Sequence, residues 1–499
     1  MGTLSPHHPA QSGAAAGPEG WPPLLSSSVS TPIPSSRPRV AIAGTSGFVG
    51  AALCETLGKH FDLRILTRSM ARRAVREQDE VRTCDHFSRG DLEAGLEGVD
   101  YAIYLVHNRD PSARLDQALS RDMDLLVADN FSWAAQRNGV KQLVYRAPLL
   151  SHPDRPTARD ARELEEVLGS HGVPLTVLRT GLVMGPGGEL SKLLVRLVER
   201  MPHLPLPRLA EHAVRPLPLE ALLAAFRHCV GNPDTFGGTF DIFGPEPVTL
   251  RQMLEDTATH LGRKAHFRPW PGMPEGHFAA LLRVVHPSLH PVFRTYLLDH
   301  FSAGTQGQDN PVMRAATLNW TPFRETLEAS LRAMTAPQPQ RRQDDEILRQ
   351  SGRVRSIQRL RLPAGRNAEW MAERYFPWLG TLMKVAVTTD RQEDGSWTVR
   401  QKPWGPLLLR LDFKPTHSSP DRRMYFITGG ALARVLGGRT ARLEFRDLLG
   451  GRFNLVAIHD FNPALPWFFY RVTQALIHGL VMKGFQGHME EASEGEAPL

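Results

Sequence analysis

Cysteine is scarce in this chain of 499 residues, which contains only Cys54, Cys84 and Cys229. Their spacing suits neither a network of disulfides nor a zinc site, so we expect no metal ion and a reducing, cytoplasmic compartment. Cys54 lies in a helical pattern and Cys84 in a strand pattern. We therefore expect both side chains to be buried as small apolar groups.

Long apolar runs are also missing. No run reaches the ~20 residues that a membrane-spanning helix needs. The most apolar segment, 466–482, is interrupted by Arg471, Gln474 and His478. The N-terminus shows no basic region followed by an apolar core, so we expect neither a transmembrane segment nor a secretory signal.

Blocks of like charge are absent as well. The net charge of +7 comes from basic residues dispersed along the chain, in pairs such as Arg72-Arg73 and Arg341-Arg342. Such dispersed basicity fits an anionic small molecule, and it leaves peripheral contact with an anionic lipid surface open. It does not indicate binding to nucleic acid.

The chain is too long for one hydrophobic core, and its composition changes along its length. We expect a disordered leader at 1–37, rich in Pro, Ser, Ala and Gly, a first domain at 38–332 and a linker at 333–352. A second domain at 353–489 and a short tail at 490–499 follow.

The first domain alternates strand-like and helical patterns. Strands are expected at 40–43, 63–67, 81–85, 101–106, 142–146 and 175–178, and helices at 48–60, 92–96, 115–138 and 159–171. Nearly continuous apolar strands separated by helices predict a doubly wound α/β fold with a parallel sheet. Residues 181–330 contain more proline and irregular sequence, which favours a smaller lobe on the C-terminal side of that sheet.

The second domain is expected to be α+β. Polar and apolar residues alternate along 356–362, and a helix is expected at 368–379. Strands are expected at 383–389, 397–402, 407–414, 423–428, 441–448 and 453–461. An amphipathic helix at 466–485 closes the pattern. The simplest arrangement is a curved antiparallel sheet around this helix, with an apolar groove between them. Trp467, Phe468 and Phe469 are then core residues, or they contact a membrane surface.

A glycine-rich turn gives the clearest functional signal. Residues 40–50 (VAIAGTSGFVG) place Gly44, Gly47 and Gly50 between a strand and a helix. In a dinucleotide site the first glycine allows a tight turn, the second lets the backbone approach a pyrophosphate, and the third lets the helix pack closely. We expect the loop residues, including Thr45, Ser46, Phe48 and Val49, to bind the cofactor at the helix N-terminus.

The ends of the next two strands indicate which dinucleotide is bound. Where an acid would hold the ribose 2′-hydroxyl, the chain has Arg68, which favours the 2′-phosphate of NADP(H), although a solvated surface arginine is the alternative. NAD(H) stays open. Asp85 ends the third strand and binds the adenine amino group or caps a turn.

Further motifs extend this pattern: 99–107 (VDYAIYLVH), 122–131 (DMDLLVADNF), 139–145 (GVKQLVY) and 178–187 (LRTGLVMGPG). Together with the glycine turn, residues 39–330 resemble the atypical short-chain dehydrogenases/reductases, in the branch related to the nucleotide-binding accessory subunit of respiratory complex I. The resemblance implies a Rossmann fold that binds NAD(P)(H). Val106 and His107, at the end of the fourth strand, are then expected to touch the cofactor.

The second domain carries the motifs 375–380 (YFPWLG), 443–446 (LEFR) and 457–461 (AIHDF). It resembles the START-like helix-grip fold, which implies an apolar ligand held between sheet and helix. His459 and Asp460 could line that groove, but a hydrogen bond at the strand end explains them equally well.

Typical reductases of this family use a Tyr-x-x-x-Lys pair on a helix and a serine after the fifth strand. Aligned on Glu165 and Glu166, the pair falls at Thr157 and Ala161, and the first serine after that strand is Ser151. The usual proton path is therefore missing, and no catalytic residue can be named.

A few other side chains are candidates for a catalytic or metal-binding role. Tyr145 and Arg146 sit near the expected nicotinamide end, although Tyr145 fits a core strand position. His286 and His290 have the i,i+4 spacing of metal ligands, but Pro287 lies between them and no third ligand is evident.

The leading hypothesis is therefore an oxidoreductase-like NADP(H)-binding protein with an apolar ligand pocket in its second domain. A non-catalytic NADPH-binding scaffold or redox sensor is the alternative. A sugar-nucleotide epimerase or dehydratase is a second alternative, because 181–187 and 240–247 resemble the extended branch of the family.

Overall fold

A computed structural model of the chain describes residues 37–68, 78–107, 115–149, 152–287, 289, 291–304, 307–317, 320–334, 353–434, 441–464, 481–482 and 484–490. Nearly all of the expected leader and tail, most of the linker and most of the helix expected at 466–485 lie outside these residues, as do Ser151, His290, Trp467, Phe468 and Phe469. Within the described part, no helix is long and apolar enough to cross a membrane.

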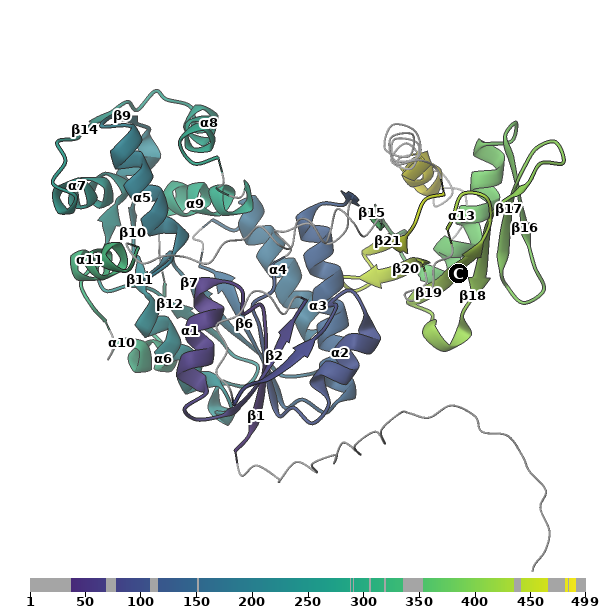
Figure 1. Cartoon of the computed structure of the whole chain (residues 1–499), viewed down its shortest axis with the longest axis horizontal. Helices are drawn as coiled ribbons and strands as arrows, with labels where there is room; N and C mark the ends of the chain where they lie inside the picture. The colour runs from purple at the N-terminus through teal and green to yellow at the C-terminus, as the bar shows by residue number, and fades with distance from the viewer. Residues whose placement is uncertain are drawn as a thin grey trace, which may run out of the picture. The chain divides into compact units, whose positions relative to one another are not determined.

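The N-terminal part is built on a seven-stranded sheet (Figure 1) with the order β12-β7-β6-β4-β1-β2-β3. The strands are β1 (Arg39–Ala43), β2 (Asp62–Thr67), β3 (Glu80–Thr83), β4 (Tyr101–Tyr104), β6 (Gln142–Pro148), β7 (Leu175–Thr180) and β12 (Thr239–Ile242). All neighbouring pairs are parallel. The doubly wound fold expected from the sequence is confirmed. The edge strand β12 was not expected, because its sequence lies in the proline-rich region.

Helices cover both faces of this sheet because its strands are apolar on both sides. Ala41 and Ala43 of β1 face a core shared with α2 (Arg89–Leu96), α3 (Ser120–Arg137) and α4 (Pro156–Gly169). Val40 and Ile42 face the opposite core, with α1 (Phe48–Leu57) and α6 (Leu219–Cys229). This alternation follows from the two-residue period of a strand. Cys54 and Cys84 are buried, as expected; Cys229 is buried as well, and none of the three forms a disulfide.

The expected smaller lobe is largely helical. It contains α5 (Glu189–Arg200), α7 (Leu250–His260), α8 (Glu275–Val285), α9 (Pro291–Ala303), α10 (Pro311–Thr317) and α11 (Phe323–Ala333). Short strands join them: β8 (Val183–Met184), β9 (His203–Leu206), β10 (Ala213–Val214), β11 (Leu217–Pro218), β13 (Val248–Thr249) and β14 (His266–Pro269). Most of these helices share a leucine-rich core.

The C-terminal part is an antiparallel sheet in the order β16-β17-β18-β19-β20-β21-β15. Its strands are β15 (Val354–Arg361), β16 (Val387–Arg391), β17 (Trp397–Gln401), β18 (Leu407–Phe413), β19 (Arg422–Gly429), β20 (Arg442–Leu448) and β21 (Phe453–Phe461). Helix α13 (Ala368–Leu382) packs on it through an aromatic core that includes Tyr375, Phe376 and Phe445. The strand expected at 383–389 begins only at Val387, because α13 continues through Leu382.

The helix expected at 115–138 is also corrected. Its first residues form a strand, β5 (Leu115–Gln117), and α3 begins at Ser120. β5 pairs in parallel with β15, so a segment of the N-terminal part is the outer strand of the C-terminal sheet. The backbone of 115–117 therefore finds its partners in a strand more than two hundred residues away in the chain.

Candidate functional site

The glycine turn between β1 and α1 is shaped by two close contacts. Gly44 has φ +96°, and a Cβ there would lie 2.5 Å from the backbone oxygen of Leu105 after β4. A Cβ on Gly50 would lie 2.6 Å from the backbone oxygen of Gly44. At Gly47, by contrast, an added Cβ would meet nothing within 4 Å. Two glycines thus pack the turn, and the third leaves its surface open.

The N-terminus of α1 offers backbone donors at this open surface. Gly47 is the N-cap, no side chain caps the helix, and the first turn contains no acidic residue. Ser46 and Gly47 are exposed, whereas Val49 and Gly50 are buried. The strand order reverses between β1 and β4, so the turn lies at the crevice where doubly wound sheets bind ligands. An unsatisfied helix N-terminus attracts an anion such as a pyrophosphate.

Three polar side chains lie at the ends of β2 and β3. Arg68 is exposed. Asp85 forms a turn, with Oδ1 accepting a hydrogen bond from the backbone of Phe87 at 3.1 Å. His86 is buried, and burial, together with the nearby charge of Arg68, lowers its pKa to about 4. Its Nε2 has no hydrogen-bond partner within the described residues. The sequence analysis missed His86.

The end of β4 faces α3. Val106 is buried and His107 is half-buried, with its Nδ1 3.9 Å from Oδ2 of Asp124. β5 begins at Leu115, close to His107 in the chain, and pairs with β15 of the C-terminal sheet.

Strands β6 and β7 each carry an arginine near the C-terminal end, and Arg179 of β7 pairs with Glu165 of α4 at 2.7 Å. Tyr145 is only 1% exposed, and burial raises its pKa, so this phenol is a core group. The next residue, Arg146, donates from Nη1 to Oγ1 of Thr180 at 3.0 Å.

Helix α9 places two further side chains, Tyr296 and His300, near the ends of β6 and β7. The hydroxyl of Tyr296 donates to the backbone oxygen of Gly181 at 3.4 Å, and its ring centroid lies 4.3 Å from that of His300. His300 is fully buried, and burial, with a smaller effect of the Arg146 charge, lowers its pKa to about 4. Neither residue was predicted from the sequence. Their i,i+4 spacing within one helix was the available signal.

Thr157 and Ala161, the positions aligned with the Tyr-Lys pair of typical reductases, lie on α4 and have structural roles. The backbone N–H of Thr157 donates to Oδ2 of Asp299 at 3.2 Å, which satisfies a donor in the first turn of the helix. Ala161 is buried. Neither side chain can exchange a proton with a ligand.

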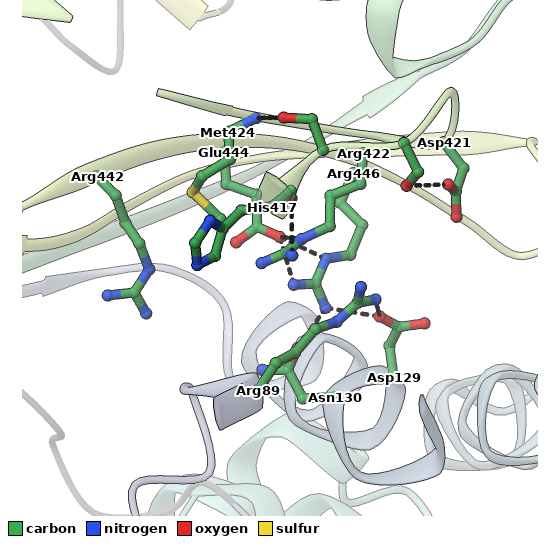
Figure 2. A network of polar contacts seen from close by, with 12 residues as sticks. Arg89, Asp129, Asn130, His417, Asp421, Arg422, Met424, Arg442, Glu444 and Arg446 are labelled. Carbon is green, nitrogen blue, oxygen red and sulfur yellow. Dashed lines mark hydrogen bonds and ion pairs between the residues drawn. The ribbon is translucent and has the colours of Figure 1, made fainter. Parts of the chain in front are cut away.

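A buried ionic network joins α3 to the C-terminal sheet (Figure 2). Arg446 of β20 donates from Nη1 to Asp129 Oδ2 at 2.6 Å and to Asn130 Oδ1 at 2.7 Å, and from Nε to Glu444 Oε1 at 2.7 Å. Arg422 binds the same Glu444 oxygen at 2.6 Å. Although burial raises the pKa of Glu444, the charges of Arg422 and Arg446 outweigh it and hold the pKa well below its usual range.

This network reaches the segment after β3. Asn130 donates from Nδ2 to the backbone oxygen of His86 at 3.2 Å. Arg442 of the C-terminal sheet donates to the backbone oxygen of Phe87 at 3.1 Å. The backbone beside Asp85 is thus held from both sides by residues of α3 and β20.

His459 and Asp460 belong to the same interface. Both are buried, with His459 Nε2 3.2 Å from Glu444 Oε2 and Asp460 Oδ2 3.0 Å from Arg442 Nη1. Of the two explanations for this pair, polar contacts at the strand end fit the structure. His286 lies against Arg196, and no group of three His, Cys, Asp or Glu side chains that could hold a metal ion occurs within the described ranges.

The space between α13 and the sheet is occupied by stacked and edge-on aromatic rings, among them Phe376 and Trp397 with centroids 4.8 Å apart. A shallow groove of about 470 Å³ lies on the other side of α13, where Trp378 and Leu382 line it together with Glu373, Arg374 and His488. The apolar groove expected between the sheet and the helix at 466–485 lies mostly outside the described residues.

Comparison with known proteins gives partial similarities. No family model matches the chain. The auxiliary protein GraX of Staphylococcus aureus is 29% identical over 143 residues, which are 28% of this chain and 43% of that protein, so the chain spans less than half of this relative's length.

Similar solved structures include three that this chain covers almost completely. They are a nucleoside-diphosphate-sugar epimerase from Staphylococcus aureus (16% identity, 58% of this chain and 99% of that chain, TM-score 0.47), the Citrobacter sp. triphenylmethane reductase complexed with NADP(H) (15%, 58% and 99%, 0.47) and an NADPH-dependent quinone oxidoreductase from Escherichia coli (19%, 60% and 100%, 0.45). These similarities assign no activity to the chain.

Proposed function

We propose that the N-terminal part binds a nicotinamide dinucleotide, with NADP(H) preferred. The observation that carries this proposal is the turn at Gly44, Gly47 and Gly50, which is tightly packed at two glycines and open at the third. The uncapped N-terminus of α1 would hold the pyrophosphate, with Thr45 and Ser46 beside it.

The adenosine end would lie over β2 and β3. Arg68 is exposed at the end of β2, so it would bind a 2′-phosphate, and Asp85 and His86 would flank the adenine. Val106 and His107 would line the ribose on the nicotinamide side. A charge-assisted hydrogen bond contributes about 1.5–3 kcal/mol, so Arg68 should account for most of the preference for NADPH over NADH.

Calorimetry with both cofactors tests the cofactor choice. Arg68→Ala should weaken NADPH binding by about 10- to 100-fold and leave NADH binding unchanged. Arg263→Ala, at an exposed arginine of the smaller lobe, is the matched control and should change neither. Equal losses for both cofactors with Arg68→Ala would refute the assignment of the 2′-phosphate.

For the reaction, we propose reduction of a small carbonyl or quinone acceptor. The bound cofactor would supply the hydride. Arg146 and Tyr296 stand where the acceptor would lie, at the ends of β6 and β7, and Tyr296 would donate a hydrogen bond or proton to the acceptor oxygen in place of the missing pair. Tyr145 is buried in the core and takes no part.

A panel of aldehydes and quinones with NADPH tests this chemistry. Tyr296→Phe should lower kcat at least about tenfold while NADPH affinity stays the same. Installing Thr157→Tyr with Ala161→Lys should not raise turnover, because Ala161 is buried among α4 core residues. A gain would show a disabled reductase whose original geometry survives.

A non-catalytic NADPH sensor is the second candidate. The contacts from Arg442 and Asn130 to the backbone after β3 favour it, because they connect the expected adenine site to the C-terminal sheet. Cofactor binding without turnover across the acceptor panel would support the sensor over the reductase.

We also propose that the C-terminal part is a START-like module. One helix packed on an antiparallel sheet supports this, and the groove beside Trp378 and Leu382 is where an apolar ligand would bind. A fluorescent fatty-acid analogue should bind the wild type, and Trp378→Ala should bind it less tightly. Equal affinity would refute this ligand site.

A further inference from the structure

Three of the exposed large apolar side chains gather at one end of the C-terminal part. Six such side chains occur among the described residues, and half of them are Leu382 (51% exposed), Val385 (87%) and Trp404 (103%). Leu382 ends α13, Val385 follows it before β16, and Trp404 lies in the turn between β17 and β18. We call these three residues the apolar tip.

Backbone hydrogen bonds hold the two segments of the tip together. The N–H of Lys402 donates to the oxygen of Ala386 at 2.9 Å, and its Nζ donates to the oxygen of Lys384 at 2.8 Å. Val387 at the start of β16 pairs with Gln401 at the end of β17, next to α13 (Figure 1). Trp404 has φ +47°, in a turn closed by a bond from the N–H of Gly405 to the oxygen of Gln401 at 3.0 Å. The indole is therefore presented on a structured turn.

Two exposed lysines lie beside the tip, whereas the carboxylate of Glu373 lines the groove on the α13 side of Leu382. Neither 374–389 nor 395–411 contains an acidic residue, whereas both segments contain lysines or arginines, including the exposed Lys384 and Lys402. The acidic residues of this hairpin are Asp390 near the end of β16 and Glu393 and Asp394 in the turn between β16 and β17, at the end opposite the tip. Lys384 and Lys402 are therefore the charged residues of the hairpin end that carries the tip.

We propose that the apolar tip docks the protein on an anionic lipid bilayer. Tryptophan favours the level of the lipid headgroups, and short apolar side chains beside it reach the acyl boundary. Lysines at the rim gain from the negative surface potential of anionic lipids. A protein partner with an apolar pocket would not need the two exposed lysines beside the tip.

Sedimentation of the full-length chain with lipid vesicles tests this proposal. Wild type should bind phosphatidylserine-rich vesicles and bind phosphatidylcholine vesicles far less, and salt should weaken binding. Replacing Leu382, Val385 and Trp404 with Ser should reduce binding at least about tenfold. Trp270→Ser, at an exposed tryptophan outside the tip, should bind like wild type.

Two further outcomes decide the role of the tip. Lys384→Glu with Lys402→Glu should abolish the preference for phosphatidylserine. Wild type that ignores both kinds of vesicle, or a triple Ser variant that binds as well as wild type, would overturn the proposal. If vesicles are ignored and ultracentrifugation shows a dimer that the triple variant loses, the tip is instead an interface between copies of the chain.

Discussion

Two buried aspartates on α3 should respond in opposite ways to the same substitution. Asp122 is 2% exposed and its Oδ1 has no hydrogen-bond partner within the described part. The nearest cations are Arg121 Nε at 3.7 Å and Arg359 Nη1 at 3.9 Å. Burial raises the pKa of Asp122 more than the charges of Arg121 and Arg359 lower it, and the pKa moves from 3.8 to about 6. A difference of about two pKa units corresponds to about 3 kcal/mol between the two protonation states.

The sign follows from proton linkage. The folded chain binds this proton more tightly than the unfolded chain, so the contribution of Asp122 to stability falls as the pH rises from 3.8 to about 6 and stays low above that pH. Asp122→Asn removes the cost of the buried charge. It should therefore raise the free energy of unfolding by up to about 3 kcal/mol at pH 8 and change it little below pH 4.

Asp129, two turns later on the same helix, provides the matched control. Its carboxylate binds Arg446 at 2.6 Å, Arg89 at 2.8 Å and His171 at 2.9 Å. Burial raises its pKa, but the Arg446 charge and the other partners outweigh this and hold the pKa below the usual range. Asp129→Asn should cost about 3–5 kcal/mol at neutral pH, because it breaks a buried pair. Because the pKa of the folded carboxyl lies well below 3.8, this loss should stay nearly constant from pH 8 to pH 4 and shrink only in stronger acid.

Urea unfolding followed by circular dichroism, from pH 4 to pH 8, measures both effects. Stabilisation by Asp122→Asn at pH 8 and destabilisation by Asp129→Asn are the expected results. If Asp122→Asn destabilises the chain at pH 8, the conclusion that burial of this carboxylate outweighs its two distant cations is wrong.

Three further predictions concern packing. Gly44→Ala should lower the melting temperature in differential scanning fluorimetry, because its Cβ would meet the backbone of Leu105 and its φ is positive; an unchanged value would contradict that packing. A fragment of residues 353–489 should fold, as the composition break predicts, but unfold at lower urea than the full chain, since Leu448 and Leu455 belong to a core shared with α2 and α3; equal midpoints would show that the shared core contributes nothing. Tyr145→Phe should leave cofactor affinity and turnover unchanged, because this phenol is buried; a selective loss of turnover would return it to the candidate site.

The sheet of the N-terminal part could be predicted because the sequence patterns that indicate it are local. Apolar strand runs, helical periods and the glycine turn each lie within a short window, and parallel strands with intervening helices allow few topologies. The glycine turn was located for the same reason: the packing of Gly44 against Leu105 follows from a motif between β1 and α1.

The contacts between the two parts could not be predicted, because they depend on residues far apart in the chain. Residues 115–117 continue the helical pattern of α3, and only the open edge of β15 makes them a strand. Arg446 lies in an alternating strand pattern that suggests an exposed side chain, and its burial depends on Asp129 and Asn130. Tyr296 was not predicted because the smaller lobe, residues 181–330, contains no sequence motif that indicates a site.

The central claim is that the open turn at Gly47 binds the pyrophosphate of a dinucleotide, and Gly47→Asp tests it most directly. An aspartate fits the N-cap of α1, so the variant should be as stable as wild type, while its carboxylate takes the helix N-H groups and repels the phosphates. Gly276→Asp, at another glycine where an added Cβ meets nothing within 4 Å, is the control. In calorimetric titrations with NADPH, wild type and Gly276→Asp should bind one equivalent, and Gly47→Asp should bind at least about tenfold less tightly. Equal affinity in all three proteins, or no binding by wild type, would contradict the account.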